Sequence, residues 1–173
     1  QGSKTPIEFN LTKYLVEGKN TIAVQVFRYS DGAYLECQDF WRLSGIERDV
    51  VLIATPKTRI RDYRINTILD SEYRNATLNV DIEIEYLGVN DLSNHKINWK
   101  LFDSDLVLIA ENIKSIISGS TIINSEIDNP LKWTAETPIL YQLVFELIEE
   151  GGEVSQVVGA KVGFRDVRIE NGL

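Results

Sequence analysis

Alternating apolar and polar residues dominate the last two thirds of the chain. The clearest run extends from Ala76 to Tyr86, where apolar side chains at every second position alternate with asparagine and carboxylate side chains. A period of two residues places these two sets on opposite faces of a β-strand. The sequence therefore predicts a strand with one buried face and one face in solvent.

Six further runs have the composition of short strands and are separated by polar or glycine-containing turns. They are Ile60 to Ile68, His95 to Phe102, Val107 to Ala110, Ser120 to Ile127, Leu140 to Ile148 and Val154 to Val162. About seven strands in roughly a hundred residues, with no convincing amphipathic helix, predict an all-β fold of the immunoglobulin-like β-sandwich type. His95 opens one strand and is interpreted as a half-buried sheet residue rather than a catalyst.

Two more β-rich runs precede Pro56, namely Thr21 to Arg28 and Val50 to Thr55. Their content of β-branched residues predicts buried strands. The later strands already suffice to close a sandwich, so these two are interpreted as the end of a preceding β-domain. Unpaired strand edges invite pairing with another chain, and self-association is therefore expected if their partner strands are absent.

The segment from Ser30 to Asp49 joins these two runs. It shows neither the two-residue period of a strand nor the 3.6-residue period of a helix. At about twenty residues it exceeds the ~12–15 beyond which structureless loops in compact domains become uncommon and are usually functional or disordered. Tyr34, Phe40 and Trp41 favour a packed, ordered loop. The sequence thus predicts an ordered loop that carries a site.

The carboxylates of this loop allow two kinds of chemistry. A retaining glycosidase needs a protonated and an ionised carboxyl group roughly 5–5.5 Å apart, and the spacing of Glu36 and Asp39 permits such a pair. Nothing in the sequence raises the pKa of either, so no catalytic residue is assigned in this chain. Asp39, beside Trp41 and Arg42, could instead bind a hard cation or sugar hydroxyl groups. Alternatively, the segment has only a structural role, in which its aromatic residues anchor the loop and its carboxylates form ion pairs with nearby arginines.

Composition excludes several classes of partner. The net charge of −8 and the isoelectric point near 4.7 would repel nucleic acid and anionic membranes. Cys37 and His95 are the only residues of their types, which excludes an intrachain disulfide, a cysteine-based metal site and a multi-histidine zinc site. The chain has no methionine and begins without a leader-like segment, so we expect a piece of a longer protein. The sequence does not distinguish between the cytoplasm and the periplasm as its compartment.

Two later segments are dense in proline, aromatic or charged residues. Asn129 to Tyr141 is interpreted as a rigid connector packed against the strand that follows. Gly163 to Gly172 still alternates polar and apolar residues, as if another element followed.

Together, three segments resemble glycoside hydrolase family 2, and specifically its large bacterial β-galactosidases. The resemblance lies in Ser30-Asp31-Gly32-x-Tyr34-Leu35-Glu36-x-Gln38-Asp39-x-Trp41-Arg42-x-Ser44-Gly45-Ile46-x-Arg48-Asp49-Val50, in Asn129-Pro130-x-x-Trp133-x-x-Glu136-x-Pro138-x-Leu140-Tyr141, and in Val162-Gly163-Phe164-Arg165-x-Val167-Arg168-Ile169-Glu170-Asn171-Gly172. Between Arg59 and Ile127 only the strand pattern corresponds.

The resemblance implies a division of the chain. Residues 1–56 would be the C-terminal part of a jelly-roll sugar-binding domain, residues 57–162 an immunoglobulin-like β-sandwich, and residues 163–173 the lead-in to a (β/α)8 catalytic barrel that lies outside this chain. The two catalytic glutamates of the family lie in that barrel, so the resemblance implies that this piece alone is inactive. The whole enzyme would act on terminal β-D-galactosides, use sodium and magnesium, and form a homo-oligomer.

One family site residue is implied for this chain. Asp39, in Gln38-Asp39-x-Trp41-Arg42, resembles the aspartate that reaches into the active site and helps to bind sodium and the galactosyl group. Cys37 departs from the family, whose members may carry an acidic residue there. A stand-alone carbohydrate-binding or adhesion module remains an alternative, as does a piece of a β-glucuronidase or β-mannosidase.

Overall fold

The fold was analysed in a computed structural model, which describes residues 6–35, 45–88, 92 and 94–168. The chain divides into two compact units, Gln1–Ile53 and Ala54–Leu173. The two units are described separately.

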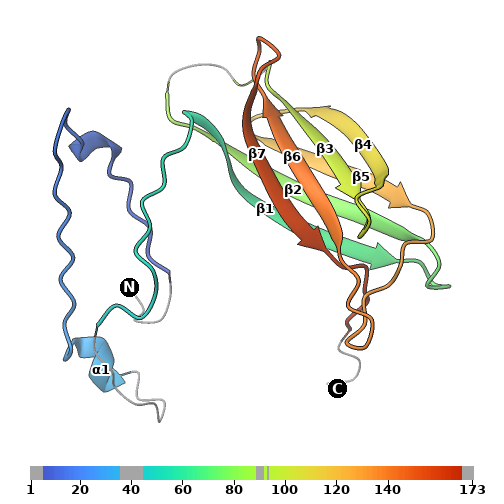
Figure 1. The fold of residues 1–173 in the computed structure, drawn as a ribbon, viewed down its shortest axis with the longest axis horizontal. Helices are drawn as coiled ribbons and strands as arrows, with labels where there is room; N and C mark the ends of the chain where they lie inside the picture. Colours follow the sequence, from blue (N-terminus) through green and yellow to red (C-terminus); the bar gives the residue numbers. More distant parts are fainter. Residues whose placement is uncertain (1–5, 36–44, 89–91, 93, 169–173) are drawn as a thin grey trace. The chain divides into compact units, whose positions relative to one another are not determined.

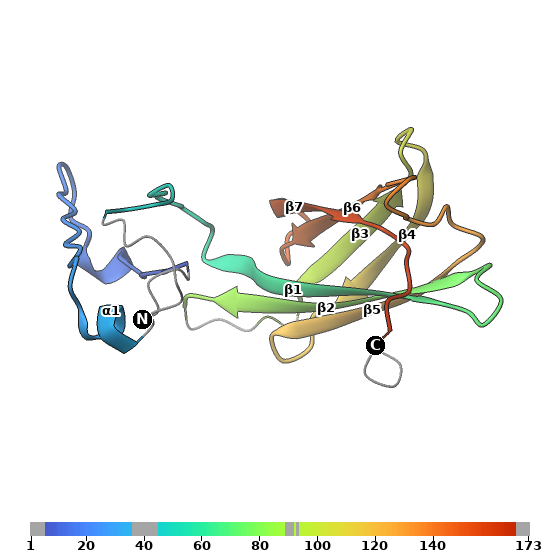
Figure 2. The same cartoon turned by 90° about the horizontal axis from the view of Figure 1, so that it is seen from below.

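The second unit contains seven strands in two antiparallel sheets (Figures 1 and 2). They are β1 (Thr58–Leu69), β2 (Ala76–Tyr86), β3 (Lys96–Phe102), β4 (Leu108–Ser115), β5 (Ser120–Ile127), β6 (Tyr141–Ile148) and β7 (Val154–Val162). One sheet has the order β1-β2-β5 and the other the order β4-β3-β6-β7. The predicted all-β sandwich is confirmed, with β4 longer than the run expected at Val107 to Ala110.

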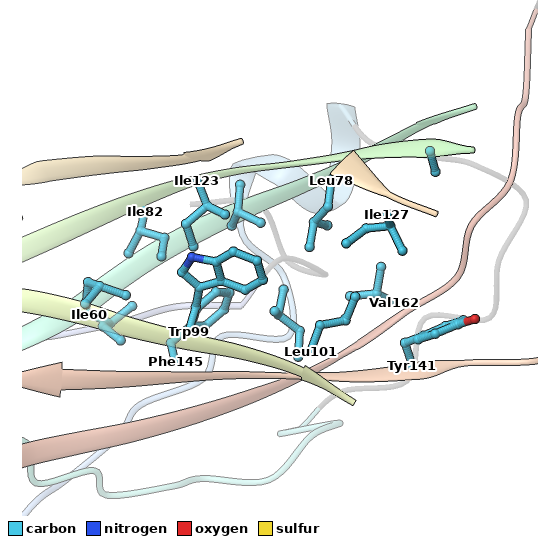
Figure 3. Packing of buried hydrophobic residues seen from close by; sticks show 14 of the residues in the cluster. Ile60, Leu78, Ile82, Trp99, Leu101, Ile123, Ile127, Tyr141, Phe145 and Val162 are labelled. Atoms are coloured by element: carbon cyan, nitrogen blue, oxygen red, sulfur yellow. The ribbon is translucent and has the colours of Figure 1, made fainter. Parts of the chain in front are cut away.

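The core lies between the two sheets and follows the alternation seen in the sequence. Along β2 and β6 every second side chain is buried, as a period of two residues requires when one face of a sheet is covered. Trp99 and Phe145 are the largest of the fully buried side chains, and Figure 3 shows them beside Ile82 and Ile123. The Phe145 ring also contacts the Tyr63 ring, with centroids 5.5 Å apart.

A hydrogen bond between β1 and β7 joins the edges of the two sheets. The backbone N–H of Ile60 donates to Gln156 Oε1 over 2.7 Å. This amide lies at a register shift between Ile60 and Asp62, where β1 no longer keeps regular pairing with β2. The side chain of Gln156 thus satisfies a backbone donor that would otherwise lack a partner at the edge of the sheet.

The first unit differs from the prediction. The runs Thr21 to Arg28 and Val50 to Thr55 form no strand, and the only regular elements described in residues 6–35 and 45–53 are the 3-10 turn Thr12–Tyr14 and the five-residue helix α1 (Asp31–Leu35). The prediction of strands there was therefore wrong for this structure. A strand needs a neighbour to accept and donate its backbone hydrogen bonds, and the described residues of this unit supply none.

Many apolar side chains among the described residues of the first unit are exposed. Val24 and Leu52, which the sequence pattern predicted to be buried, are 60% and 74% exposed. The helix α1 falls within the segment from Ser30 to Asp49, which was predicted to be a loop throughout.

No helix among the described residues is long and apolar enough to cross a membrane.

Candidate functional site

The segment from Ser30 to Asp49 is the principal candidate site, and the structure describes its two ends. Asp39 lies outside the described residues, as do Glu36, Trp41 and Arg42. The role assigned to Asp39 therefore stays a prediction from the sequence. The same holds for the expectation that Glu36 and Asp39 do not form a catalytic pair.

The described ends of this segment are open to solvent. At the N-terminal end, Tyr34 and Leu35 are 72% and 85% exposed, and the backbone N–H of Ala33 donates to the Ser30 carbonyl oxygen over 2.9 Å. Glu47 and Asp49 at the other end are exposed as well. Among the residues that the structure describes, no group of three or more His, Cys, Asp or Glu side chains could hold a metal ion.

The connector from Asn129 to Tyr141 packs against the strand that follows it, as the sequence predicted. The backbone N–H of Leu131 donates to the Tyr141 hydroxyl group over 2.8 Å. Thr134 and Thr137 close a turn, in which the Thr137 N–H donates to Thr134 Oγ1 over 2.9 Å. Pro130 is buried within this connector, so the segment is rigid by packing as well as by composition.

A groove of about 680 Å³ lies within the second unit and was not predicted from the sequence. Its walls are the second half of β1, the end of β7 and the segment that follows β7. Trp133 lines it, and the Arg165 guanidinium group lies 5.0 Å from the centre of the Trp133 ring. The Asp166 carboxylate pairs with Arg168 over 2.6 Å. Because a cation already lies over the tryptophan ring, we do not assign the groove as a sugar site.

Among the described residues of the second unit, two carboxyl groups have a resolved pKa shift, and both pKa values are lowered. Hydrogen bonds from Lys100 and, to a smaller extent, Asn98 lower the pKa of Glu146, against the opposing effect of its partial burial. Hydrogen bonds from the backbone N–H groups of Asn75 and Arg74 lower the pKa of Asp70. A catalytic acid of a glycosidase needs a raised pKa instead, so we interpret both groups as structural.

The Asp70 carboxylate holds the turn that follows β1. Asp70 accepts from the Arg74 N–H over 2.8 Å and from the Asn75 N–H over 2.9 Å, which holds the turn between β1 and β2. In that turn Tyr73 has φ of 56°, a backbone conformation that needs local hydrogen bonds to compensate its cost.

His95 immediately precedes β3 and is half-buried, which agrees with the interpretation of a structural residue. Its backbone N–H donates to the Leu92 carbonyl oxygen over 3.0 Å, and its carbonyl oxygen accepts from the Ile116 N–H over 3.1 Å. These bonds anchor the start of the strand.

The fold of the second unit is that of an antiparallel sandwich domain, a class that many unrelated proteins share. Comparison of the sequence with family models is more specific. Residues 1–56 match "Glycosyl hydrolases family 2, sugar binding domain" and residues 58–165 match "Glycosyl hydrolases family 2". The second match alone covers more than half of the chain, and the chain belongs to glycosyl hydrolases family 2.

Similar curated proteins carry the name β-galactosidase. The chain is 39% identical to the β-galactosidase of Priestia megaterium and 41% identical to that of Pseudoalteromonas haloplanktis. The matches cover 100% and 99% of this chain and 17% of each relative. The chain thus corresponds to about a sixth of the length of these relatives.

Solved structures with a similar fold include β-glucuronidases. That of Parabacteroides merdae gives a TM-score of 0.57 at 17% sequence identity, and that of Bifidobacterium dentium a TM-score of 0.55 at 19%. Each comparison covers 66% of this chain, and 15% or 19% of the other. At this level of identity the likeness shows a common fold.

Proposed function

We propose that the full-length protein to which this chain belongs is a retaining β-galactosidase that hydrolyses terminal β-D-galactosides. The observation that carries the proposal is identity of 39% and 41% to two curated β-galactosidases over essentially the whole chain. The likeness to β-glucuronidases concerns the fold at 17–19% identity, which carries no information on the substrate.

The roles that we propose for the three parts of the chain follow the resemblance to family 2 enzymes. Residues 1–56 belong to a sugar-binding domain, residues 57–162 form the sandwich, and residues 163–173 lead into a catalytic (β/α)8 barrel. The catalytic glutamates lie in that barrel, and the present chain therefore contributes scaffold and is inactive alone.

Asp39 is the residue of this chain that we place in the active site of the full-length enzyme. An ionised carboxylate offers both charge and oxygen lone pairs, which suit a hard cation such as sodium and the hydroxyl groups of a galactosyl unit. We propose that Asp39 binds both. Sodium and magnesium would be the cations of the full-length enzyme, which we expect to be a homo-oligomer.

The test uses the full-length reading frame that contains this segment. The purified protein is assayed with a chromogenic β-galactoside and, in parallel, with the matching β-glucuronide and β-mannoside. We expect hydrolysis of the galactoside with retention of the anomeric configuration, and the product configuration can be followed by NMR. Preference for the glucuronide or the mannoside would refute the proposed substrate. A reading frame that encodes no barrel and a protein that binds sugars without hydrolysis would favour the stand-alone module.

A further inference from the structure

The polypeptide that leaves β7 is held by backbone pairing with the connector and by a side-chain hydrogen bond from β1 before it reaches the surface. Phe164 forms an isolated parallel bridge with Lys132, and its carbonyl oxygen accepts from the Trp133 N–H over 2.9 Å. The carbonyl oxygen of Gly163 accepts from Thr67 Oγ1 over 3.2 Å. The exit segment, residues 163–168, is thus tied to both the connector and β1 (Figure 1).

Close packing holds the first two residues of the exit segment. Phe164 is fully buried, and its ring lies edge-on to that of Tyr141, with centroids 5.0 Å apart. At Gly163, an added Cβ atom would lie 3.1 Å from Trp133 Cβ and 3.3 Å from Leu140 Cδ2. A side chain at position 163 would therefore require the tryptophan or the leucine to move.

Arg165 makes the next contact, at the point where the segment reaches solvent. Its guanidinium group lies over the Trp133 ring, 5.0 Å from the ring centre, in the geometry of a cation–π interaction. Arg165 is exposed whereas Phe164 is buried. Removal of the Arg165 side chain should therefore leave the core intact.

We propose that Trp133 and Arg165 form a clamp that fixes the direction in which the polypeptide leaves the sandwich and, in the full-length protein, the placement of the domain that follows. This inference rests on the proposed function, in which Asp39 precedes the sandwich and the catalytic glutamates follow it. The sandwich then acts as a spacer between the two parts of one active site, and the clamp orients one end of this spacer. Arg165 is a positioning residue in this scheme.

The clamp is tested first in the 173-residue chain by amide hydrogen exchange. Because an exposed cation–π interaction is worth little, Arg165→Ala should accelerate exchange of the Trp133 amide about two- to fivefold. The Leu106 amide, in the turn between β3 and β4, donates to the Asp103 carbonyl oxygen and exchanges by local opening of that turn, so its rate should not change. Arg165→Lys should give an intermediate acceleration at Trp133. Arg64→Ala is the matched control, since it removes another exposed arginine, which pairs with Asp81. An unchanged rate at Trp133 in Arg165→Ala would overturn the clamp.

The placement of the following domain is tested in the full-length protein. Arg165→Ala should raise the KM for a chromogenic β-galactoside, and the sodium concentration that gives half-maximal activity, each by about the same two- to fivefold. The melting temperature should not change, and Arg165→Lys should recover part of the effect. Accelerated exchange without any change in KM or sodium response would overturn the positioning role. A wild-type protein that does not hydrolyse galactosides would instead contradict the proposed function, and the exchange experiment would still decide on the clamp.

Discussion

Lys100 Nζ contacts both carboxylate oxygens of Glu146, at 2.9 and 3.1 Å, across strands β3 and β6. The amide of Asn98 donates to Glu146 Oε2 over 2.7 Å. The side chains of Lys100 and Glu146 are 29% and 22% exposed, so this pair is shielded from solvent more than a typical surface ion pair. These partners lower the pKa of Glu146.

The lowered pKa of Glu146 predicts a stability that depends on pH. A carboxyl group whose pKa is lower in the folded than in the unfolded state stabilises the fold above the unfolded pKa, here about 4.3 for an ordinary glutamate. This contribution is lost as the pH falls through the folded pKa. Lys100→Ala should therefore cost about 1 kcal/mol at pH 7 and much less at pH 3.

Denaturant unfolding of both proteins at the two pH values measures this difference. Lys96→Ala is a matched control, because Lys96 is an exposed lysine on the same strand. An equal loss of stability at pH 7 and pH 3 would show that the Lys100 side chain acts through packing and not through the charge of Glu146.

The core of the sandwich predicts a large difference between two neighbours on β6. Phe145 is fully buried, and Phe145→Ala should cost about 3–5 kcal/mol because it leaves a cavity. Val144 lies on the opposite face of the strand and is half-buried, so Val144→Ala should cost about 1 kcal/mol or less. Thermal unfolding followed by circular dichroism would compare the two variants. Similar losses would contradict the assignment of the two faces.

Asp39 carries a prediction for the full-length enzyme. Asp39→Asn keeps the shape of the side chain and removes its charge, so galactoside hydrolysis should fall by about tenfold or more and activation by sodium should weaken. Folding should not change. Asp105→Asn is the control, because Asp105 is an exposed aspartate in the turn between β3 and β4, outside this segment. Unchanged kinetics of Asp39→Asn at all sodium concentrations would remove Asp39 from the site.

Exposed apolar side chains in the first unit predict self-association of the 173-residue chain. Val24, Val51 and Leu52 are all at least 60% exposed, and a large exposed apolar area favours association. Sedimentation velocity should show a mean mass that increases with concentration. Residues 54–173 contain the whole sandwich core and should stay monomeric under the same conditions. A 173-residue chain that is monomeric at every concentration would refute the prediction.

Local pattern was sufficient to predict the seven strands of the sandwich. The alternation from Ala76 to Tyr86 reappears as alternating burial along β2, because the two faces of a strand are determined by residue spacing alone. The same kind of pattern failed for Thr21 to Arg28. Apolar, β-branched residues show that a segment is suited to a sheet, whereas a strand also requires a partner from elsewhere.

For the candidate site, too, some features could be predicted from the sequence and others could not. The motif around Asp39 is a property of the sequence, and the structure does not describe that residue. The Trp133–Arg165 contact joins residues 32 positions apart, and no local pattern signals it.

The sequence by itself determined the strand composition, the identity of the inward-facing residues and the family, because each depends on residue types at short spacing. Only the tertiary structure decided the strand orders β1-β2-β5 and β4-β3-β6-β7, and the contact of the exit segment with the connector. These features depend on which of several compatible strands pair across long stretches of chain. That choice is made by packing of the whole core, in which Trp99 and Phe145 fit between two sheets assembled from distant segments.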